Sequence, residues 1–338
     1  MKNKPINIKQ LAQKLNLSTS TVSRAFRNNS DINPLTKELI LTKAKELNYH
    51  PNFYASSLRD KKTKTIAVIL PELANNFFSQ AVKGIEQVAS EKGYHTLIYV
   101  TESDFKKEVS IVENLSNGRV DGIIMSASGE GVDHRYINRL KEWHIPVVFF
   151  DRVYDDINAP KVITNDYESS FLATEHLIKS GCKKIALLVI DKALSIGKIR
   201  LAGYKDALQK HNIRLKEEWV VDCSNDFNIS YGAISTLLST IKPDGLLATV
   251  ERLAINAYHV CQAQKIAIPK SVKIISYSSL EIAALLNPSL STITQPALDM
   301  GKKAVTLLFD SLRKPLLISD IEPVIFESVI IPRNSTRS

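Results

Sequence analysis

The segment Leu17–Phe26, which reads LSTSTVSRAF, decides how the rest of the chain is interpreted. It begins with a serine that can cap a helix, and small hydroxyl side chains and one arginine follow on the outward face of that helix. The major groove of DNA admits a helix of this kind, and its polar side chains can reach the edges of the bases. The segment is therefore predicted to be a recognition helix.

The distribution of charge along the chain supports this prediction. Residues 1–64 hold 13 Lys and Arg against 4 Asp and Glu, a balance of +9, while the whole chain of 338 residues has 44 against 35, also +9. The remaining 274 residues are therefore neutral in sum. A basic terminus alone is often only a solvated tail, but this one also has helical periodicity and capping residues, which a tail does not need.

Length and composition exclude several classes of protein. A chain of 338 residues is expected to form two or three domains, and 44% hydrophobic with 23% charged residues is typical of a soluble globular protein. Because there is no run of about 18 apolar residues and no apolar stretch behind the polar N-terminus, we expect neither a membrane span nor a signal peptide. Cys182, Cys223 and Cys261 form no CxxC pair, which argues against a disulfide framework or zinc site and favours the cytoplasm.

Two short helices are predicted before Phe26. Asn7 is placed to cap the first, with Gln10 three residues later to complete a capping box. Asn16 and Leu17 then form a turn, and Ser18 caps the second helix. The pattern of helix, short turn and helix is typical of a helix-turn-helix unit.

A third helix is predicted from Asn33, which can cap it, and Pro34, which suits the first helical position. We expect it to end near Tyr49, because Pro51 disfavours helical geometry at His50. Its apolar side chains are expected to close a small core, and they are Leu39, Ile40, Ala44 and Leu47.

The segment Asn52–Arg59 has helical composition but is too short to be stable alone. A polar linker, residues 60–64, follows it. Because cations flank this marginal segment, contact with a polyanion could order it, and we interpret it as a hinge that folds on DNA.

From Thr65 onward, short β-branched runs alternate with amphipathic helices. Runs without polar alternation are typical of strands buried on both faces of a parallel sheet. The pattern occurs twice, which predicts two doubly wound α/β halves and a ligand cleft at the carboxyl ends of their strands. The predicted strands are 66–70, 95–100, 120–125, 147–151, 184–190, 220–223, 245–249, 272–277 and 291–294, and residues 297–312 and 324–331 are expected to complete the two halves.

The order of these segments closely resembles that of the LacI (lactose repressor) / GalR family of transcriptional regulators. The resemblance covers essentially the whole chain. It rests on residues 8–12, 17–24, 47–52 and 57–59 near the amino end, and on 75–78, 120–123, 145–148, 151–152, 172–177, 200–204, 291–296 and 333–336 in the core.

The resemblance implies a small all-α helix-turn-helix headpiece and a periplasmic-binding-protein-like core of two doubly wound parallel-sheet subdomains. The implied domains are a DNA-binding headpiece at 1–50, a hinge and linker at 51–64, and an effector-binding and dimerisation core at 65–338. The implied N-subdomain covers about 65–160 and 295–320, and the C-subdomain about 162–291 and 323–338.

The resemblance also implies which residues touch DNA. Base contacts fall on Thr19, Ser20, Arg24 and Leu58, where Leu58 is the leucine that wedges into the minor groove at the operator centre. Backbone contacts fall on Ser18, Thr21, Ser23, Asn33, Tyr49, Asn52 and Arg59. Ser56 stands where arginine is common in the family, which is expected to weaken one contact with the DNA backbone.

For the effector cleft, the family positions fall on Phe77, Phe78, Asp151, Arg200, Phe227, Ser278 and Gln295. Arg200 offers planar recognition of hydroxyls or a carboxylate, and a phenylalanine can stack on a sugar or base. Core packing remains an alternative for the phenylalanines, and a surface ion pair remains one for Arg200.

The chain departs from the family near this cleft. Val250 and Glu251 replace an Asn-Asp pair, residues 276–279 read SYSS where Gly-Phe-Asp-Asp is usual, and Asn165-Asp166 reverses the usual order. Two customary hydrogen-bond partners of a sugar are therefore missing, at Val250 and Ser278. The effector cannot be inherited from sugar-binding relatives.

The family implies a homodimer, sometimes a tetramer, that binds a near-palindromic operator in the cytoplasm, represses transcription and needs no cofactor or metal. An enzyme built on the same halves is the rival class. The sequence has no phosphate-binding G-x-x-x-x-G-K-[ST], no G-x-G-x-x-G after a strand and no H-E-x-x-H, so we expect no enzyme. A general nucleoid-binding protein would make no use of the neutral core and would bind DNA without sequence preference.

Overall fold

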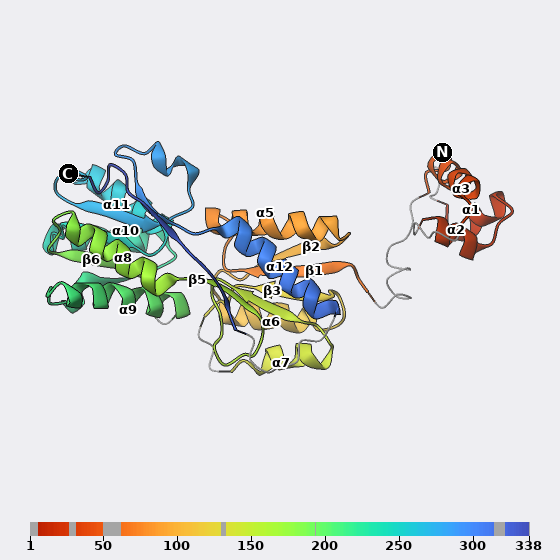
Figure 1. Cartoon of the computed structure of the whole chain (residues 1–338), viewed down its shortest axis with the longest axis horizontal. Helices are drawn as coiled ribbons and strands as arrows, with labels where there is room; N and C mark the ends of the chain where they lie inside the picture. The colour runs from red at the N-terminus through yellow and green to blue at the C-terminus, as the bar shows by residue number, and fades with distance from the viewer. Residues whose placement is uncertain are drawn as a thin grey trace. The chain divides into compact units, whose positions relative to one another are not determined.

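The computed structural model describes residues 6–26, 32–49, 62–129, 133–192, 194–313 and 322–337. The chain divides into two compact units, Met1–Thr63 and Lys64–Ser338 (Figure 1). In the described part, no helix is long and apolar enough to cross a membrane. The helices of the first unit are α1 (Ile8–Lys14), α2 (Thr19–Ala25) and α3 (Pro34–Glu46).

The predicted helix-turn-helix is confirmed, together with the capping residues that delimit it. Asn7 and Gln10 form the capping box of α1, each side chain accepting from the other residue's backbone N–H at 3.0 and 2.9 Å. Asn16 adopts a left-handed φ of 51°, and the N–H of Leu17 donates to the carbonyl of Ala12 at 3.0 Å. This closure is a Schellman motif, which ends α1 and turns the chain toward α2 at Ser18.

Helix α3 starts as predicted but ends three residues earlier than expected. Asn33 caps it, and its last residue is Glu46, because Asn48 takes a left-handed φ of 51° and the N–H of Tyr49 donates back to Ala44 at 2.8 Å. The expectation that Leu39 lies in the core was wrong, since its side chain is 55% exposed. The buried core of this unit consists of Leu11, Ala12, Val22, Ala25, Ile40, Ala44 and Tyr49.

The second unit contains two six-stranded sheets, and we call the first sheet with its helices the N-lobe. All its strand pairs are parallel, in the order β11-β5-β4-β3-β1-β2. The strands are β1 (Thr65–Leu70), β2 (His95–Val100), β3 (Gly122–Met125), β4 (Val147–Phe150), β5 (Lys161–Thr164) and β11 (Val324–Phe326). The helices are α5 (Asn76–Glu91), α6 (Phe105–Leu115), α7 (Arg135–Glu142) and α12 (Ala297–Arg313).

The second sheet and its helices form the C-lobe, with strand order β12-β10-β9-β8-β6-β7. Only β12 is antiparallel to its neighbour, β10. The strands are β6 (Ile185–Ile190), β7 (Val220–Cys223), β8 (Gly245–Ala248), β9 (Lys273–Tyr277), β10 (Ser291–Thr294) and β12 (Val329–Ile331). The helices are α8 (Asp166–Lys179), α9 (Ser195–Lys210), α10 (Phe227–Thr240) and α11 (Glu251–Ala263), with short 3-10 turns at Glu217–Trp219 and Glu281–Ala284.

Each central strand supplies two hydrophobic cores, as its continuous apolar run predicts. In β1, Ile66 and Val68 pack with α5 and α12, whereas Ala67 and Ile69 pack with α6 and α7 on the opposite face. Because side chains alternate across a strand, both faces of the sheet are covered by helices. Strand β2 is the exception to the predicted double burial, since it lies at the edge of the sheet and is largely exposed.

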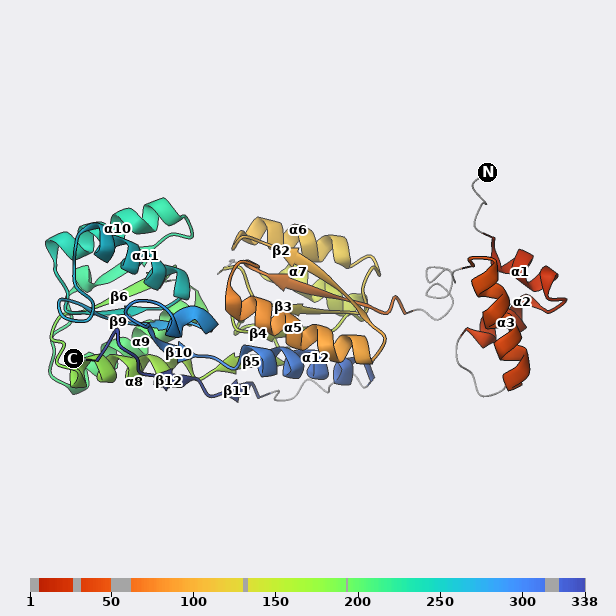
Figure 2. The same ribbon diagram turned by 90° about the horizontal axis from the view of Figure 1, so that it is seen from above.

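Three described segments cross between the lobes, after β5, after β10 and after β11 (Figure 2). Strand β5 was not predicted, and the segment 324–331, which was expected to help complete the two halves, contains two strands that belong to different sheets. The expected subdomain limits therefore shift, because 161–164 and 324–326 pair within the N-lobe sheet. The crossings are joined at Asn165, whose side chain accepts from the N–H of Ser328 at 2.8 Å.

Helices α5 and α12 pack with their backbones in contact, and this allows a prediction of stability. A Cβ added at Gly301 would lie 2.1 Å from the carbonyl oxygen of Ala81, a backbone atom that cannot move aside. We expect Gly301→Ala to lower the free energy of unfolding by about 1–3 kcal/mol, measured by urea denaturation. Gly232→Ala in α10 is the matched control, because a Cβ there meets no atom within 4 Å. The control should gain about 0.5–1 kcal/mol, and equal effects of the two changes would contradict this account.

Candidate functional site

The surface of α2 presents the side chains predicted to contact DNA bases. Thr19, Ser20 and Arg24 are exposed, whereas Val22 and Ala25 on the opposite side are buried. The hydroxyl of Ser18 lies 2.7 Å from that of Ser20 and 2.8 Å from that of Thr21, and it also caps the helix. Local hydrogen bonds thus fix the orientation of the hydroxyls at the start of the helix.

The residues predicted to contact the DNA backbone differ in their exposure. Ser18 is exposed, and Thr21 and Ser23 on α2 are partly exposed. Asn33 is exposed but uses its side chain to cap α3. Tyr49 is buried in the headpiece core and packs its ring against Phe26, with 5.5 Å between the ring centroids. The predicted contacts Asn52, Leu58 and Arg59 lie outside the described residues.

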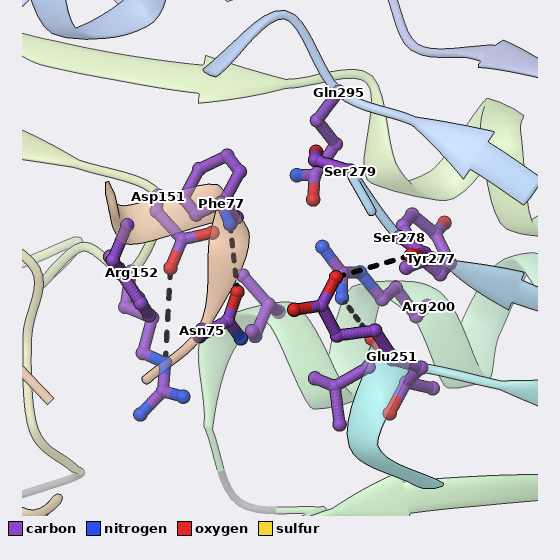
Figure 3. A pocket seen from close by; sticks show the side chains of 14 residues that line it. Asn75, Phe77, Asp151, Arg152, Arg200, Glu251, Tyr277, Ser278, Ser279 and Gln295 are labelled. Carbon is purple, nitrogen blue, oxygen red and sulfur yellow. Dashed lines mark hydrogen bonds and ion pairs between the residues drawn. The ribbon is translucent and has the colours of Figure 1, made fainter. Parts of the chain in front are cut away.

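A cleft opens between the N-lobe and the C-lobe, at the carboxyl ends of several strands (Figure 3). It encloses about 380 Å³, part of it open to solvent. Its lining consists of Asn75, Phe77, Phe78, Asp151, Arg152, Ile196, Arg200, Thr249, Val250, Glu251, Tyr277, Ser278, Ser279 and Gln295.

The structure brings together six of the seven residues predicted for an effector site, the exception being Phe227. Its ring is 46% exposed at the start of α10, where it stacks on Tyr231 and meets the edge of His259. Helix α10 begins at Phe227, because Asp226 accepts from the N–H of Ile229 and caps the helix. Phe227 is therefore held on the first turn of this helix rather than in the cleft.

Phe77 and Phe78 belong both to the cleft and to the N-lobe core. Their rings are nearly perpendicular, with centroids 5.2 Å apart, and Phe78 also meets Phe150 at 6.1 Å. Both side chains are buried within the cluster formed by α5, α12 and the sheet. The two interpretations offered by the sequence are thus compatible, because core packing fixes the rings at the cleft wall.

Arg200 is a buried residue of the cleft rather than a partner in a surface ion pair. Its Nε donates to the carboxylate of Asp166 at 2.8 Å, and Nη1 donates to the carbonyl of Thr249 at 2.5 Å. The guanidinium lies over the ring of Tyr277, 3.7 Å from the centroid. Burial disfavours the cation, but the carboxylates of Asp166 and Asp151 outweigh this effect and raise the pKa of Arg200.

Asp151 and Arg152 follow the carboxyl end of β4 and form a second pair of opposite charges. Asp151 has a left-handed φ of 63° and accepts from the hydroxyl of Ser126 at 3.2 Å. Burial raises its pKa to about 6, although Arg152 and Arg200 act in the opposite direction. Arg152 Nε lies 3.9 Å from this carboxylate and has no hydrogen-bond partner, whereas Nη1 donates to Ser103 at 3.1 Å.

The sequence analysis did not predict several residues of the cleft, notably Arg152 and Tyr277. It noted Glu251 only because the residue differs from the one usual in the family. Arg152 could have been found as the next residue after Asp151, at the end of a predicted strand. The carboxylate of Glu251 accepts from the hydroxyl of Ser278 at 3.1 Å. No pattern in the sequence indicates this contact, because 27 residues separate the two.

The cleft therefore combines two carboxylates, two guanidinium groups and two side-chain amides with a wall of aromatic rings. Such a mixture of donors and acceptors suits an uncharged polar ligand with several hydroxyl groups, whose flat face could rest on Phe77. Gln295 lies on an interlobe crossing and donates from its Nε2 to the hydroxyl of Thr164, the last residue of β5, at 3.0 Å. A ligand in the cleft would thus lie beside a segment that joins the two lobes.

Comparison with known protein families assigns both units. The family of bacterial regulatory proteins named lacI matches residues 7–52. The family of periplasmic binding proteins and the sugar binding domain of the LacI family matches residues 63–315.

Individual relatives match over nearly the whole chain. The ribose operon repressor of Haemophilus influenzae is 31% identical over 310 residues, which are 91% of this chain and 92% of that protein. The HTH-type transcriptional repressor PurR of Aliivibrio salmonicida is 30% identical over 312 residues, 90% and 92% of the two chains.

Solved structures show the same fold. The lac repressor dimer bound to operator and an anti-inducer superposes with a TM-score of 0.86 at 23% identity, covering 99% of this chain and 100% of that one. A LacI family regulator from Enterococcus faecium with bound ribose has a TM-score of 0.72 at 25% identity, covering 81% and 98%. The helix-turn-helix, the two-lobed core and these matches together place the chain in the LacI family of bacterial transcriptional regulators, which are not enzymes.

Proposed function

We propose that the protein is a transcriptional repressor that binds a near-palindromic operator as a homodimer. Binding of a sugar or sugar derivative in the cleft changes the affinity of the protein for this operator. The observation that carries this proposal is the pairing of two features in one chain. A basic helix-turn-helix exposes Thr19, Ser20 and Arg24, and a neutral core holds Asp151 beside Arg152 in a cleft between two lobes. Such a protein acts on chromosomal DNA in the cytoplasm.

The roles of the headpiece residues follow from their exposure. We infer that Thr19, Ser20 and Arg24 contact base edges and that neighbouring hydroxyl groups contact phosphates. Contacts with bases determine which DNA sequence is bound, whereas contacts with phosphates orient the protein on the duplex. Leu58 is proposed as the minor-groove wedge on the sequence alone.

The chemistry of the cleft favours a sugar as effector. Asp151 can accept from one hydroxyl while the unpartnered Nε of Arg152 donates to its neighbour, an arrangement that suits adjacent hydroxyl groups on a ring. Ribose is bound by the Enterococcus faecium relative. In this chain, however, Val250 offers no hydrogen bond and Ser278 is already bonded to Glu251, so the effector differs from that of relatives with polar partners at these positions.

The test begins with selection of an operator from random duplexes, followed by thermal shift with pentoses, hexoses, glycosides and nucleobases. Each ligand that raises the Tm is then added to operator binding. A sugar should change the operator Kd, and Asp151→Asn should abolish its thermal shift while leaving the fold intact. Asp133→Asn, an exposed carboxylate of the N-lobe, is the matched control. DNA binding without sequence preference, or an unchanged shift in Asp151→Asn, would contradict the proposal.

The homodimer is proposed from exposed apolar side chains on both lobes. Leu97 and Ile98 project from the edge strand β2, and Leu285 of the C-lobe is 81% exposed. Other members of this set are Leu73, Phe227, Ile229 and Ile282. Burial of exposed apolar side chains drives association, so sedimentation velocity should give a dimer for the native chain and a monomer for the double variant Ile98→Asp, Leu285→Asp. A monomeric native chain would exclude this assembly.

A further inference from the structure

A group of polar contacts between protein groups joins the two walls of the cleft. On the N-lobe side, the contacts involve the first two turns of α5 and the segment that precedes this helix. On the C-lobe side, they involve the start of α11 and the loop after β9. We call this group the clasp, and its members are Glu72, Asn76 and Gln80 of the N-lobe and Glu251, Arg252 and Ser279 of the C-lobe.

The first contact of the clasp is an ion pair between Glu72 and Arg252. Arg252 Nη2 lies 2.9 and 2.8 Å from the two carboxylate oxygens of Glu72, and both side chains are mostly buried. The side chain of Asn75 donates to the same carboxylate at 3.2 Å, which orients it toward the other lobe. An ion pair with this geometry and restricted exposure is stronger than an exposed pair.

The second contact places the carboxylate of Glu251 at the N-terminus of α5. Glu251 Oε1 accepts from the backbone N–H of Asn76 at 2.9 Å, and Asn76 is the first residue of that helix. The first amides of a helix have no acceptor within it, and the positive end of the helix dipole favours an anion. Asn75 caps the amide of Phe77 from within the N-lobe at 2.9 Å, and the C-lobe supplies the acceptor for the preceding amide, that of Asn76.

The remaining contacts converge on one carbonyl oxygen. The side-chain amides of Asn76 and Gln80 both donate to the carbonyl of Ser279, the latter at 3.2 Å. Ser279 follows Ser278, which holds the second oxygen of Glu251. Figure 3 shows the two facing sides of the cleft, with Asn75 and Phe77 of the N-lobe on one side and Glu251, Ser278 and Ser279 of the C-lobe on the other.

We propose that the clasp holds the two lobes together in the ligand-free protein, so that a closed cleft is the resting state. All these contacts lie where the two lobes face each other, and several of them share a residue. We therefore expect them to form and break together. The clasp lies beside the cleft that contains Asp151 and Arg152. An effector would therefore act on a conformation that the chain already adopts by itself.

The amide of Asn76 provides a direct measurement of closure. Its hydrogen-bond acceptor is Glu251 of the opposite lobe, so its protection from hydrogen exchange depends on the clasp rather than on α5. Exchange at this amide is followed by NMR in the full-length, ligand-free protein. Arg252→Gln breaks the ion pair without touching Asn76 or Glu251, and Glu251→Ala provides the rate of the unprotected amide. Arg139→Gln is the matched control, since it breaks an ion pair with Glu113 inside the N-lobe.

We expect slow exchange at Asn76 in the native chain and exchange about fivefold faster in Arg252→Gln, approaching the rate in Glu251→Ala. Arg139→Gln should leave the rate unchanged, and amides of β1 should stay protected in every variant. If Arg252→Gln does not fold, Glu72→Gln breaks the same pair from the N-lobe. Exchange in the native chain as fast as in Glu251→Ala, or no change in either ion-pair variant, would overturn the proposal. Neither DNA nor effector is needed, so this result is independent of the proposed function.

Discussion

Operator affinity should fall roughly a thousandfold or more when the salt concentration rises from 50 to 200 mM, provided that about six or more phosphates are neutralised. The physical reason is the release of condensed counterions, each of which costs less to release when the bulk salt is dilute. The basic excess of +9 lies within residues 1–64, and a dimer would bring two such segments to one duplex. Fluorescence anisotropy across a salt series gives the slope of log Kd against log salt.

Two controls make the salt series specific to the headpiece. A duplex of scrambled sequence should bind more weakly but keep a steep slope, because phosphate contacts do not depend on sequence. The core alone, residues 64–338, carries almost no net charge and should not bind either duplex. A flat profile for the full chain, or binding by the core, would show that the amino-terminal cations do not carry the interaction.

The second large effect concerns the buried pair of Arg200 and Asp166. Arg200→Met should lower the free energy of unfolding by about 3–5 kcal/mol, because the carboxylate of Asp166 would remain buried without its cation. Both side chains are almost fully buried, with 3% and 5% exposure. The carbonyl of Thr249 would also lose its donor. Urea denaturation at neutral pH, with the slope checked for two-state behaviour, measures the loss.

The double variant Arg200→Met, Asp166→Leu separates a charge effect from a packing effect. Removal of both charges should recover most of the stability, because an apolar pair avoids the desolvation of two ions. Arg135→Met is the control, since Arg135 pairs with Asp133 on the surface, and it should change stability by less than about 1 kcal/mol. A loss for Arg200→Met as small as that of the control would mean that the buried pair contributes little.

Sequence alone determined the elements whose boundaries depend on local chemistry. Asn7, Ser18 and Asn33 cap their helices as predicted, because a side-chain oxygen next to a free amide needs no distant partner. The continuous apolar runs likewise predicted buried parallel strands, and the repetition of the pattern predicted two lobes. The charge count identified the basic unit in the same way, because it is a sum over residues and requires no geometry.

Only the tertiary structure decided which elements share a sheet and which side chains meet in the cleft. Strands β5 and β11 have four and three residues, and they form because a neighbouring strand edge supplies their hydrogen bonds. Leu39 follows the helical period yet stays exposed, and Phe227 lies on a helix outside the cleft. Glu251 reaches the first amide of α5 across 175 residues of sequence. Such contacts depend on how two lobes face each other, which no local pattern of residues encodes.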